Sequence, residues 1–386
     1  MTLPVLNSYR SGIYYTESET DMAGSTLGTG FRITTWGESH GKALGVVIDG
    51  CPAGLKLCGA DIQAFLDRRK PGQSKYTTAR AEGDEVEILS GVFEGMTTGT
   101  PISLIVYNKD QHSSDYTQIA SCYRPGHADY TFDAKYGFRD YRGGGRSSGR
   151  ETIGRVAAGA IASKILNCLN IRILSYTSSI GNIAVDHSRF DEGQINKNPL
   201  YMPDADAAAR AGKYLDKLRE EGNSSGGVVE CMIKGMPAGT GEPVFDKADA
   251  ELAKAIMSIG AVKAVEIGDG IKVSSSTGLD NNDFFMMDGE KIVKKSNHSG
   301  GILGGMTDGS DIILRAHFKP TPSVSASQET VNKSGEEISI NIKGRHDPII
   351  VPRAVVVVES MTAITLVDLL IRNMSSKIDN LKKLYL

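Results

Sequence analysis

The sequence predicts an α+β fold in which antiparallel sheets pack around a helical layer. This β-α-β sandwich would form one large, internally duplicated domain. Two observations lead to the prediction. Strand-like segments rich in β-branched residues are mixed with helical patterns, without the strict alternation of a parallel α/β fold. A series of short motifs also occurs twice, in the same order, in the two halves of the 386-residue chain.

The first copy covers about residues 22–170. Its motifs are, in order, GVVIDGCPAG (45–54), a helix from Asp61 ended by Pro71-Gly72, a strand VEI from Val86, and GMTTGTPISL (95–104). The chain then passes Arg124-Pro125 and enters a helix that begins near Glu151. Apolar residues at positions 153, 156 and 160 share one face of that helix.

The second copy covers about residues 225–386 and repeats this order. Its motifs are VVECMIKGMPAG (228–239), a helix from Asp246 ended by Gly260, a strand VEI from Val265, and GMTDGSDIIL (305–314). The chain then passes Lys319-Pro320 and enters a helix that begins near Ala363. Chance can explain any single pair of glycine-rich motifs, but four pairs in matching order indicate a two-fold duplication.

Four further segments are rich in β-branched residues and are predicted strands: ISLIVY (102–107), IRILSY (171–176), ISINIKG (338–344) and AVVVVES (354–360). No apolar run approaches the roughly 18 residues that a membrane helix needs, so no span is expected. Residues 1–21 lack the basic and apolar regions of a secretory signal. We interpret them as a disordered upstream extension and begin the fold at Met22.

The composition indicates a soluble globular protein of the cytoplasm. A formal charge of −3 argues against a general nucleic-acid binder, so a basic site must be local. The five cysteines are odd in number and lack the spacing of zinc ligands, which suggests reduced thiols. The histidines have no metal-ligand spacing either, so no metal site is predicted.

The stretch RDYRGGGRSSGRET (139–152) is the strongest local signal for an anion site. Ser148 and Glu151 match a capping box at the start of a helix, where unpaired N–H groups attract anions. Arg142, Arg146 and Arg150 can add bidentate hydrogen bonds to phosphate or carboxylate. The stretch matches neither a Walker A loop nor G-x-G-x-x-G. An ordinary capped helix with surface arginines, or an RNA-binding Arg-Gly segment, remains an alternative.

Two histidines lie among glycines and charged residues: His40 in TTWGESHGKALG and His127 in YRPGHADYTFDAKYG. Such surroundings predict loops open to ligand, although most loop histidines have no catalytic role. An unperturbed pKa near 6.5 would suit either imidazole to general acid catalysis.

Seven fragments in this order resemble the chorismate synthase family from about Met22 to the end: WGESHG, RRKPGQSKYTTAR, RPGHADYT, YRGGGRSSGRET, GGILGG, KPTPS and GRHDP. Each fragment is weak alone, but the ordered set is specific. The resemblance implies a lyase of the shikimate pathway that converts 5-enolpyruvylshikimate 3-phosphate to chorismate and phosphate by 1,4-anti-elimination. It also implies reduced FMN as cofactor, although the reaction has no net redox change.

The resemblance also implies the site residues. Those expected to bind FMN are Arg146, Ser147, Ser148, Gly260, Ala261, Gly304, Lys319, Pro320, Thr321, Pro322, Ser323 and Arg345. Those expected around the substrate are Ser39, Arg69, Lys75, Arg124 and Arg150. His40 and His127 match the family's proton donors, and Asp347 matches the carboxylate that takes the ring proton together with the flavin N5.

Some of these residues have simpler interpretations. Lys75 stands where the family often has arginine and loses the guanidinium fork, which makes it the weakest substrate contact. Arg345 and Asp347 could pair with each other, Arg69 could interact with a helix C-terminus, and Lys319 could lie on the surface.

Two other functions remain open: an NAD(P)H-dependent flavin reductase, and an RNA-binding protein that uses the Arg-Gly segment. The family resemblance implies a homotetramer and no nucleic-acid or membrane partner. NADPH could serve as the reductant, but without an extra domain we favour a separate flavin reductase.

Overall fold

The computed structural model describes residues 24–76, 83–109, 120–341 and 347–386. Its first large sheet has five antiparallel strands in the order β1-β2-β3-β7-β4. These are β1 (Thr26–Leu27), β2 (Arg32–Gly37), β3 (Ala43–Asp49), β7 (Ile102–Tyr107) and β4 (Val86–Ile88). Alternate residues of β7 are buried, which is the pattern of a sheet with one face on the core.

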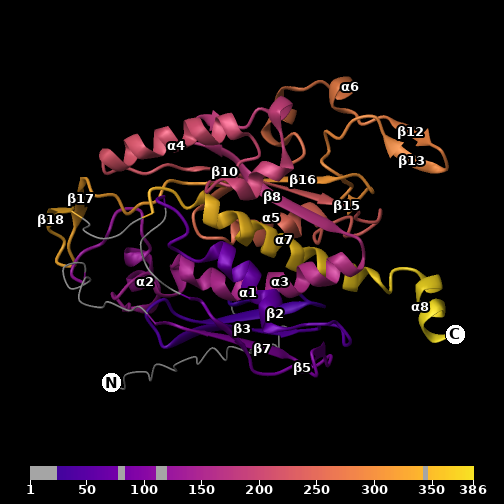
Figure 1. The fold of residues 1–386 in the computed structure, drawn as a ribbon, viewed down its shortest axis with the longest axis horizontal. Coiled ribbons are helices and arrows are strands. Elements are labelled where there is room, and N and C mark those ends of the chain that lie inside the picture. The colour runs from indigo at the N-terminus through magenta and orange to yellow at the C-terminus, as the bar shows by residue number, and fades with distance from the viewer. Residues whose placement is uncertain (1–23, 77–82, 110–119, 342–346) are drawn as a thin grey trace, which may run out of the picture.

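The second large sheet also has five antiparallel strands, in the order β11-β16-β10-β8-β9. These are β11 (Val262–Ile267), β16 (Ile312–Phe318), β10 (Gly227–Lys234), β8 (Arg172–Ile180) and β9 (Ile183–Ala184). The central strand β10 pairs along its length with both β16 and β8. Figure 1 shows this sheet above the helices and the first sheet below them.

The helices between the sheets are α1 (Gly59–Arg69), α3 (Thr152–Cys168), α5 (Ala248–Met257) and α7 (Val351–Asn373). α3 and α7 pack so closely that a Cβ added at Gly159 would lie 2.1 Å from the Cβ of Ser360. Glycine at this crossing therefore lets the two backbones approach. The two sheets and these helices share one hydrophobic core.

Smaller helices and hairpins lie around this core. The helices are α2 (Asp129–Tyr136), α4 (Ala205–Glu220), α6 (Gly278–Asn281) and α8 (Ile378–Tyr385). The hairpins are β5–β6 (Val92–Phe93, Met96–Thr97), β12–β13 (Phe285–Asp288, Lys291–Lys294), β14–β15 (Ile302–Leu303, Met306–Thr307) and β17–β18 (Ser327–Val331, Glu337–Asn341). α2 and hairpin β17–β18 lie at the end of the molecule where α7 begins, on the left in Figure 1.

The predicted α+β class with antiparallel sheets is confirmed. The helices predicted from Asp61 and Asp246 correspond to α1 and α5, and the one near Glu151 corresponds to α3. The predicted strand AVVVVES is wrong, because these residues form the first half of α7. The start predicted near Ala363 is accordingly twelve residues late, since α7 begins at Val351 with Pro352 in its first turn.

The expectation that no apolar run is long enough for a membrane span is also wrong. Among the described residues, α7 is the one helix with that length and apolarity. Its apolar stretch is 83% buried inside the protein, as expected for a core helix that is hydrophobic on all sides. The valines form a helix here because burial between two sheets outweighs their weak preference for strands.

Candidate active site

A glycine of the Arg-Gly stretch packs against His40. Gly143 has φ +143°, and a Cβ at this position would lie 2.4 Å from both Cε1 and Nδ1 of the imidazole. Ser39 is buried, and its Oγ lies 3.0 Å from His40 Nδ1. The fold therefore brings together two of the quoted fragments, WGESHG and YRGGGRSSGRET, and leaves room for the imidazole because residue 143 has no side chain.

The arginines of this stretch are held in different ways. Arg146 donates through Nη2 to Thr35 Oγ1 at 2.8 Å and through Nη1 to the Gly37 carbonyl at 3.2 Å, so it is anchored on β2. Arg142 forms an exposed ion pair of 2.6 Å with Asp140. Arg150 is directed inward and is nearly buried. Of the three arginines proposed for anion binding, Arg150 is the one in the interior.

The predicted capping box at Ser148 is only half formed. Ser148 Oγ accepts from the Arg150 N–H at 3.3 Å and caps a short 3-10 turn (Gly149–Glu151) that leads into α3. Glu151 does not return the bond, because its carboxylate accepts from Thr35 Oγ1 at 2.8 Å and Arg155 Nε at 2.7 Å. The Ser147 hydroxyl donates to the Gly144 carbonyl at 2.7 Å, which closes the preceding turn.

A buried carboxylate joins two of the predicted substrate arginines. Asp84 lies 2.6 Å from Arg69 Nη2 and 3.1 Å from Arg150 Nη1. Arg69 also donates to the Gly149 carbonyl at 3.2 Å, and Arg150 Nε donates to Asn108 Oδ1 at 2.8 Å. Because its side chain is 1% exposed, Arg69 is an interior residue and not a surface partner of the α1 C-terminus.

Asp347 lies beside the same group. Arg353 Nη1 donates to Asp347 Oδ2 at 2.6 Å, and Arg353 Nε donates to the Arg69 carbonyl at 3.0 Å. Asp347 is therefore paired with Arg353, whereas its expected partner, Arg345, lies outside the described residues. Among the described residues, this cluster brings the guanidinium groups of Arg69, Arg150 and Arg353 together with the carboxylates of Asp84 and Asp347.

His127 belongs to a second cluster, formed with the KPTPS segment. Its Nε2 lies 2.9 Å from Ser323 Oγ. Lys319 Nζ donates to the Gly126 carbonyl at 2.9 Å, so Lys319 is not a plain surface residue. A Cβ on Gly126 would lie 2.7 Å from Pro322 Cβ, which shows how closely the two segments approach.

The hydrogen bonds of His127 define its tautomer. Nδ1 lies 3.0 Å from the Pro125 carbonyl, which can only accept, so Nδ1 carries a proton. The neutral ring then accepts the Ser323 hydroxyl proton at Nε2. Burial lowers the pKa of His127, and the positive charge of Arg124 lowers it further. The neutral form is therefore favoured at pH 7 while no anion is bound.

Arg124 itself is committed to a neighbour. Its guanidinium makes two bonds of 2.8 Å to the two oxygens of Asp129, and the pair is buried. This pair fixes the start of α2 immediately after His127. Any contact of Arg124 with the substrate is therefore made while Arg124 is still paired with Asp129.

Backbone contacts join the two clusters. Ser224 Oγ donates to the Thr321 carbonyl at 2.7 Å, and the adjacent Ser225 N–H donates to the Pro348 carbonyl at 2.9 Å. The KPTPS segment and the turn of Asp347 are thus held by consecutive residues. The Lys319 N–H also donates to the Ala261 carbonyl at 2.9 Å, which adds Gly260 and Ala261 to this wall.

Among the described residues, two of those predicted for the site, Lys75 and Gly304, are not brought into these clusters. Lys75 is exposed and pairs with Asp216 at 2.7 Å. Gly304 lies in the β14–β15 turn next to the α5 N-terminus, where the Ala248 N–H donates to the Gly305 carbonyl. Gly260 follows the C-terminal end of α5. A helix of this length places that end about 15 Å from the N-terminal end beside Gly304, so the two glycines lie apart. Arg345 is not described.

Sequence reasoning missed Asp84, Asn108, Arg353 and Asp129, which hold the predicted arginines. These residues belong to no recognisable motif, since only the folded chain brings Asp84 to Arg150.

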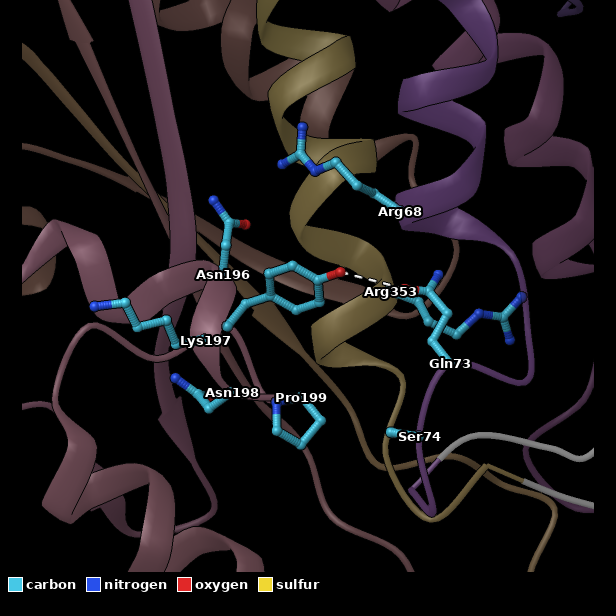
Figure 2. A pocket seen from close by; sticks show the side chains of 9 residues that line it. Arg68, Gln73, Ser74, Asn196, Lys197, Asn198, Pro199 and Arg353 are labelled. Atoms are coloured by element: carbon cyan, nitrogen blue, oxygen red, sulfur yellow. Dashed lines mark hydrogen bonds between the residues drawn. The ribbon is translucent and has the colours of Figure 1, made fainter.

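Sequence reasoning also missed a cavity of about 260 Å³ next to the first cluster. The Tyr201 hydroxyl lies 3.3 Å from Gln73 Oε1. Figure 2 shows Arg68 and Gln73 on one side of the cavity and Asn196, Lys197 and Asn198 on the other. The cavity is lined by Arg68, Gln73, Ser74, Asn196, Lys197, Asn198, Pro199, Tyr201 and Arg353.

Known proteins similar to this chain agree on one family. The family model for chorismate synthase matches residues 31–371. A chorismate synthase of Agathobacter rectalis is 66% identical over 94% of this chain and 99% of its own length. One of Lachnospira eligens is 64% identical over 94% of this chain and 100% of its own. A crystal structure of chorismate synthase, 32% identical, superposes with a TM-score of 0.73 over 92% of this chain and 96% of its own. The chain therefore belongs to the chorismate synthase family.

Proposed function

We propose that the chain converts 5-enolpyruvylshikimate 3-phosphate to chorismate and phosphate, and that it does so where the two clusters meet. Family membership supports the reaction. The observation that supports the place is the gathering of three guanidinium groups, those of Arg69, Arg150 and Arg353, next to the carboxylate of Asp347. A substrate with two carboxylates and a phosphate requires such concentrated charge, although the whole chain is acidic.

In this proposal each catalytic side chain handles one proton. His40, held by Ser39 and enclosed by Gly143, and His127, held by Ser323, act as proton donors as the phosphate leaves. Asp347, oriented by Arg353, receives the ring proton. Arg69 and Arg150 bind the substrate's anionic groups.

The residues near the KPTPS segment fit a flavin phosphate. Thr321 Oγ1 is buried and has no hydrogen-bond partner among the described residues, so it is an unused donor in this wall. Lys319 Nζ uses one of its protons for the Gly126 carbonyl and can supply further donors. When bound, reduced FMN lends electron density to the substrate as phosphate leaves and recovers it afterwards.

We further propose a homotetramer in the cytoplasm. The hairpin β12–β13 exposes large apolar side chains, among them Phe285 at 61% and Ile292 at 70%, and a two-stranded hairpin is marginal without a partner. Four of the cysteines are free thiols, which suits a reducing compartment: Cys51, Cys58, Cys168 and Cys231. A separate reductase, or NADPH itself, would supply the reduced flavin.

The internal duplication also remains a proposal. Two features support it: both large sheets have five antiparallel strands, and each half ends in a long helix of the central layer. In addition, the two X-Pro segments, at Arg124-Pro125 and Lys319-Pro320, meet at the His127 cluster. Superposition of residues 24–170 on residues 225–373 with matched strand order would support it, and mismatched strand order would refute it.

An anaerobic assay tests the proposed reaction. The protein is mixed with 5-enolpyruvylshikimate 3-phosphate and either dithionite-reduced or oxidised FMN, and phosphate and chorismate are measured. We expect one phosphate per chorismate with the reduced cofactor and neither product with the oxidised one. Oxidation of NADPH in the presence of FMN, without phosphate release, would instead identify a flavin reductase.

A further inference from the structure

We propose that Asp84 is a positioning residue that holds the guanidinium groups of Arg69 and Arg150 side by side, so that together they bind one anionic group of the substrate. This inference rests on the proposed function. It adds a residue that the sequence motifs did not indicate.

The geometry supports a shared anchor. The side chain of Asp84 is fully buried, and each of its oxygens faces a different arginine, at 2.6 Å and 3.1 Å. Arg69 comes from the end of α1 and Arg150 from the turn before α3, so no local structure would keep them together. Two guanidinium groups repel each other, and a buried carboxylate between them offsets that repulsion.

The backbone at Asp84 is specialised for this placement. Its φ is +47°, a left-handed conformation that asparagine and aspartate tolerate better than other residues with side chains. Gln63 of α1 holds the turn, since its Nε2 donates to the Asp84 carbonyl at 3.3 Å and its Oε1 accepts from the Val86 N–H at 3.2 Å. The turn thus directs the carboxylate inward, toward the arginines.

Charge indicates what the pair would bind. Arg69 and Arg150 bring two guanidinium groups to one place, and such groups bind carboxylate or phosphate oxygens through bidentate hydrogen bonds. Arg69 Nε is buried and has no hydrogen-bond partner among the described residues. A buried donor without a partner is unfavourable, and an anion bound at this position would supply the missing acceptor. A carboxylate or phosphate oxygen of the substrate has the required chemistry.

The variant Asp84→Asn tests the inference, because asparagine keeps the size and the left-handed backbone and removes only the charge. We expect KM for the phosphorylated substrate to rise about tenfold or more while kcat changes little, since substrate and transition state lose the same interaction. Asp84→Gly, which also tolerates this backbone, should give the same KM change. Asp49→Asn, which changes a solvent-accessible carboxylate paired with Arg32, is the matched control and should behave as wild type.

A purely structural role would give a different result. Asp84→Asn and Asp84→Gly would then unfold at lower temperature with wild-type KM, and that outcome would overturn the inference. If both variants fold poorly, the cycle of Arg69→Met, Arg150→Met and their double mutant decides: non-additive KM changes support binding of one anionic group by the pair, and additive changes refute it. Failure of the wild type to form chorismate would instead overturn the proposed function.

Discussion

At the scale of single residues, the two predicted proton donors are held by different neighbours. His40 has a serine at Nδ1 and a glycine against its ring, and His127 lies between the Pro125 carbonyl and the Ser323 hydroxyl. A proton donor needs a fixed ring and an environment that adjusts its pKa to the reaction. Both requirements can be tested separately.

Removal of either imidazole should abolish most turnover. We expect kcat of His40→Ala and His127→Ala to fall about 100-fold or more, the usual contribution of a positioned general acid. His187→Ala, in an exposed turn remote from both clusters, should keep wild-type kcat. Unchanged kcat in both site variants, measured anaerobically with reduced FMN, would remove these residues from the mechanism.

The depressed pKa of His127 predicts its protonation state in the free protein. Burial and the charge of Arg124 disfavour the imidazolium, so the ring should titrate below the ordinary value of about 6.5. As pH falls from that value, the unfolded chain takes up the proton first, so His127 reduces stability across this window. An NMR titration showing a midpoint above 6.5 without ligand would contradict the buried position of His127 beside Arg124.

Sequence patterns identified many residues of the candidate site but not the neighbouring residues that orient them. His40 and Gly143 are distant in sequence, and their contact depends on how β2 and the Arg-Gly stretch fold together. Asp84 and Arg353 have no motif of their own, because an ion pair carries no local signature. The pairing of Asp347 with Arg353 is likewise visible only in three dimensions.

At the scale of elements, α4 is the helix with the most complete N-terminal cap. Asp204 Oδ1 accepts from the N–H groups of Asp206 and Ala207 at 3.0 and 3.2 Å, and Oδ2 lies 2.8 Å from Arg189 Nη2. The hydrogen bond from Arg189 and those from backbone N–H groups hold the pKa of this carboxyl well below its usual range.

Removal of this cap should destabilise the protein in a pH-dependent way. Asp204→Ala should lower the free energy of unfolding by about 2 kcal/mol at pH 7. The stabilisation is complete above the unfolded pKa of about 3.9 and is lost as pH falls through the lower folded value. Urea unfolding at several pH values checks this, with Asp206→Ala, an exposed neighbour, as the control. A difference that persists unchanged at pH 2 would contradict it.

The error at α7 also belongs to this scale. Its valine run satisfies every local criterion for a strand, and only the space between two sheets makes a helix the better structure. α1, α3 and α5 were predicted correctly because their apolar residues repeat with helical spacing and their ends carry recognisable signals.

At the scale of the whole molecule, contact between α3 and α7 joins the two halves. Gly159 permits this contact, since an added Cβ would lie 2.1 to 2.5 Å from Ser360 atoms. The matched position for comparison is Gly59, where an added Cβ meets nothing within 4 Å.

Gly159→Ala should therefore destabilise the protein although alanine favours helices. Overpacking usually costs about 1–3 kcal/mol, and a clash with backbone cannot be relieved by a side-chain rotation. Gly59→Ala should be neutral or slightly stabilising. Thermal unfolding of both variants measures this, and an equal or higher midpoint for Gly159→Ala would show that the helices can separate without cost.

The α+β class followed from sequence, because strand and helix periods are local properties. The order of strands within each sheet did not, since pairing depends on which long-range contacts bury the most apolar surface. The exposed apolar hairpin β12–β13 was also not foreseen, because its side chains resemble those of any buried strand.

The central claim is that His40, the buried cluster of Arg69 and Arg150, and the cluster of His127 serve one reaction at one place. A crystal structure of the protein with FMN and 5-enolpyruvylshikimate 3-phosphate tests it most directly. We predict one substrate whose anionic groups contact Arg69 and Arg150, with His40, His127 and Asp347 around the same flavin. A flavin bound at the KPTPS segment and a substrate bound elsewhere, beyond contact with each other, would contradict the account.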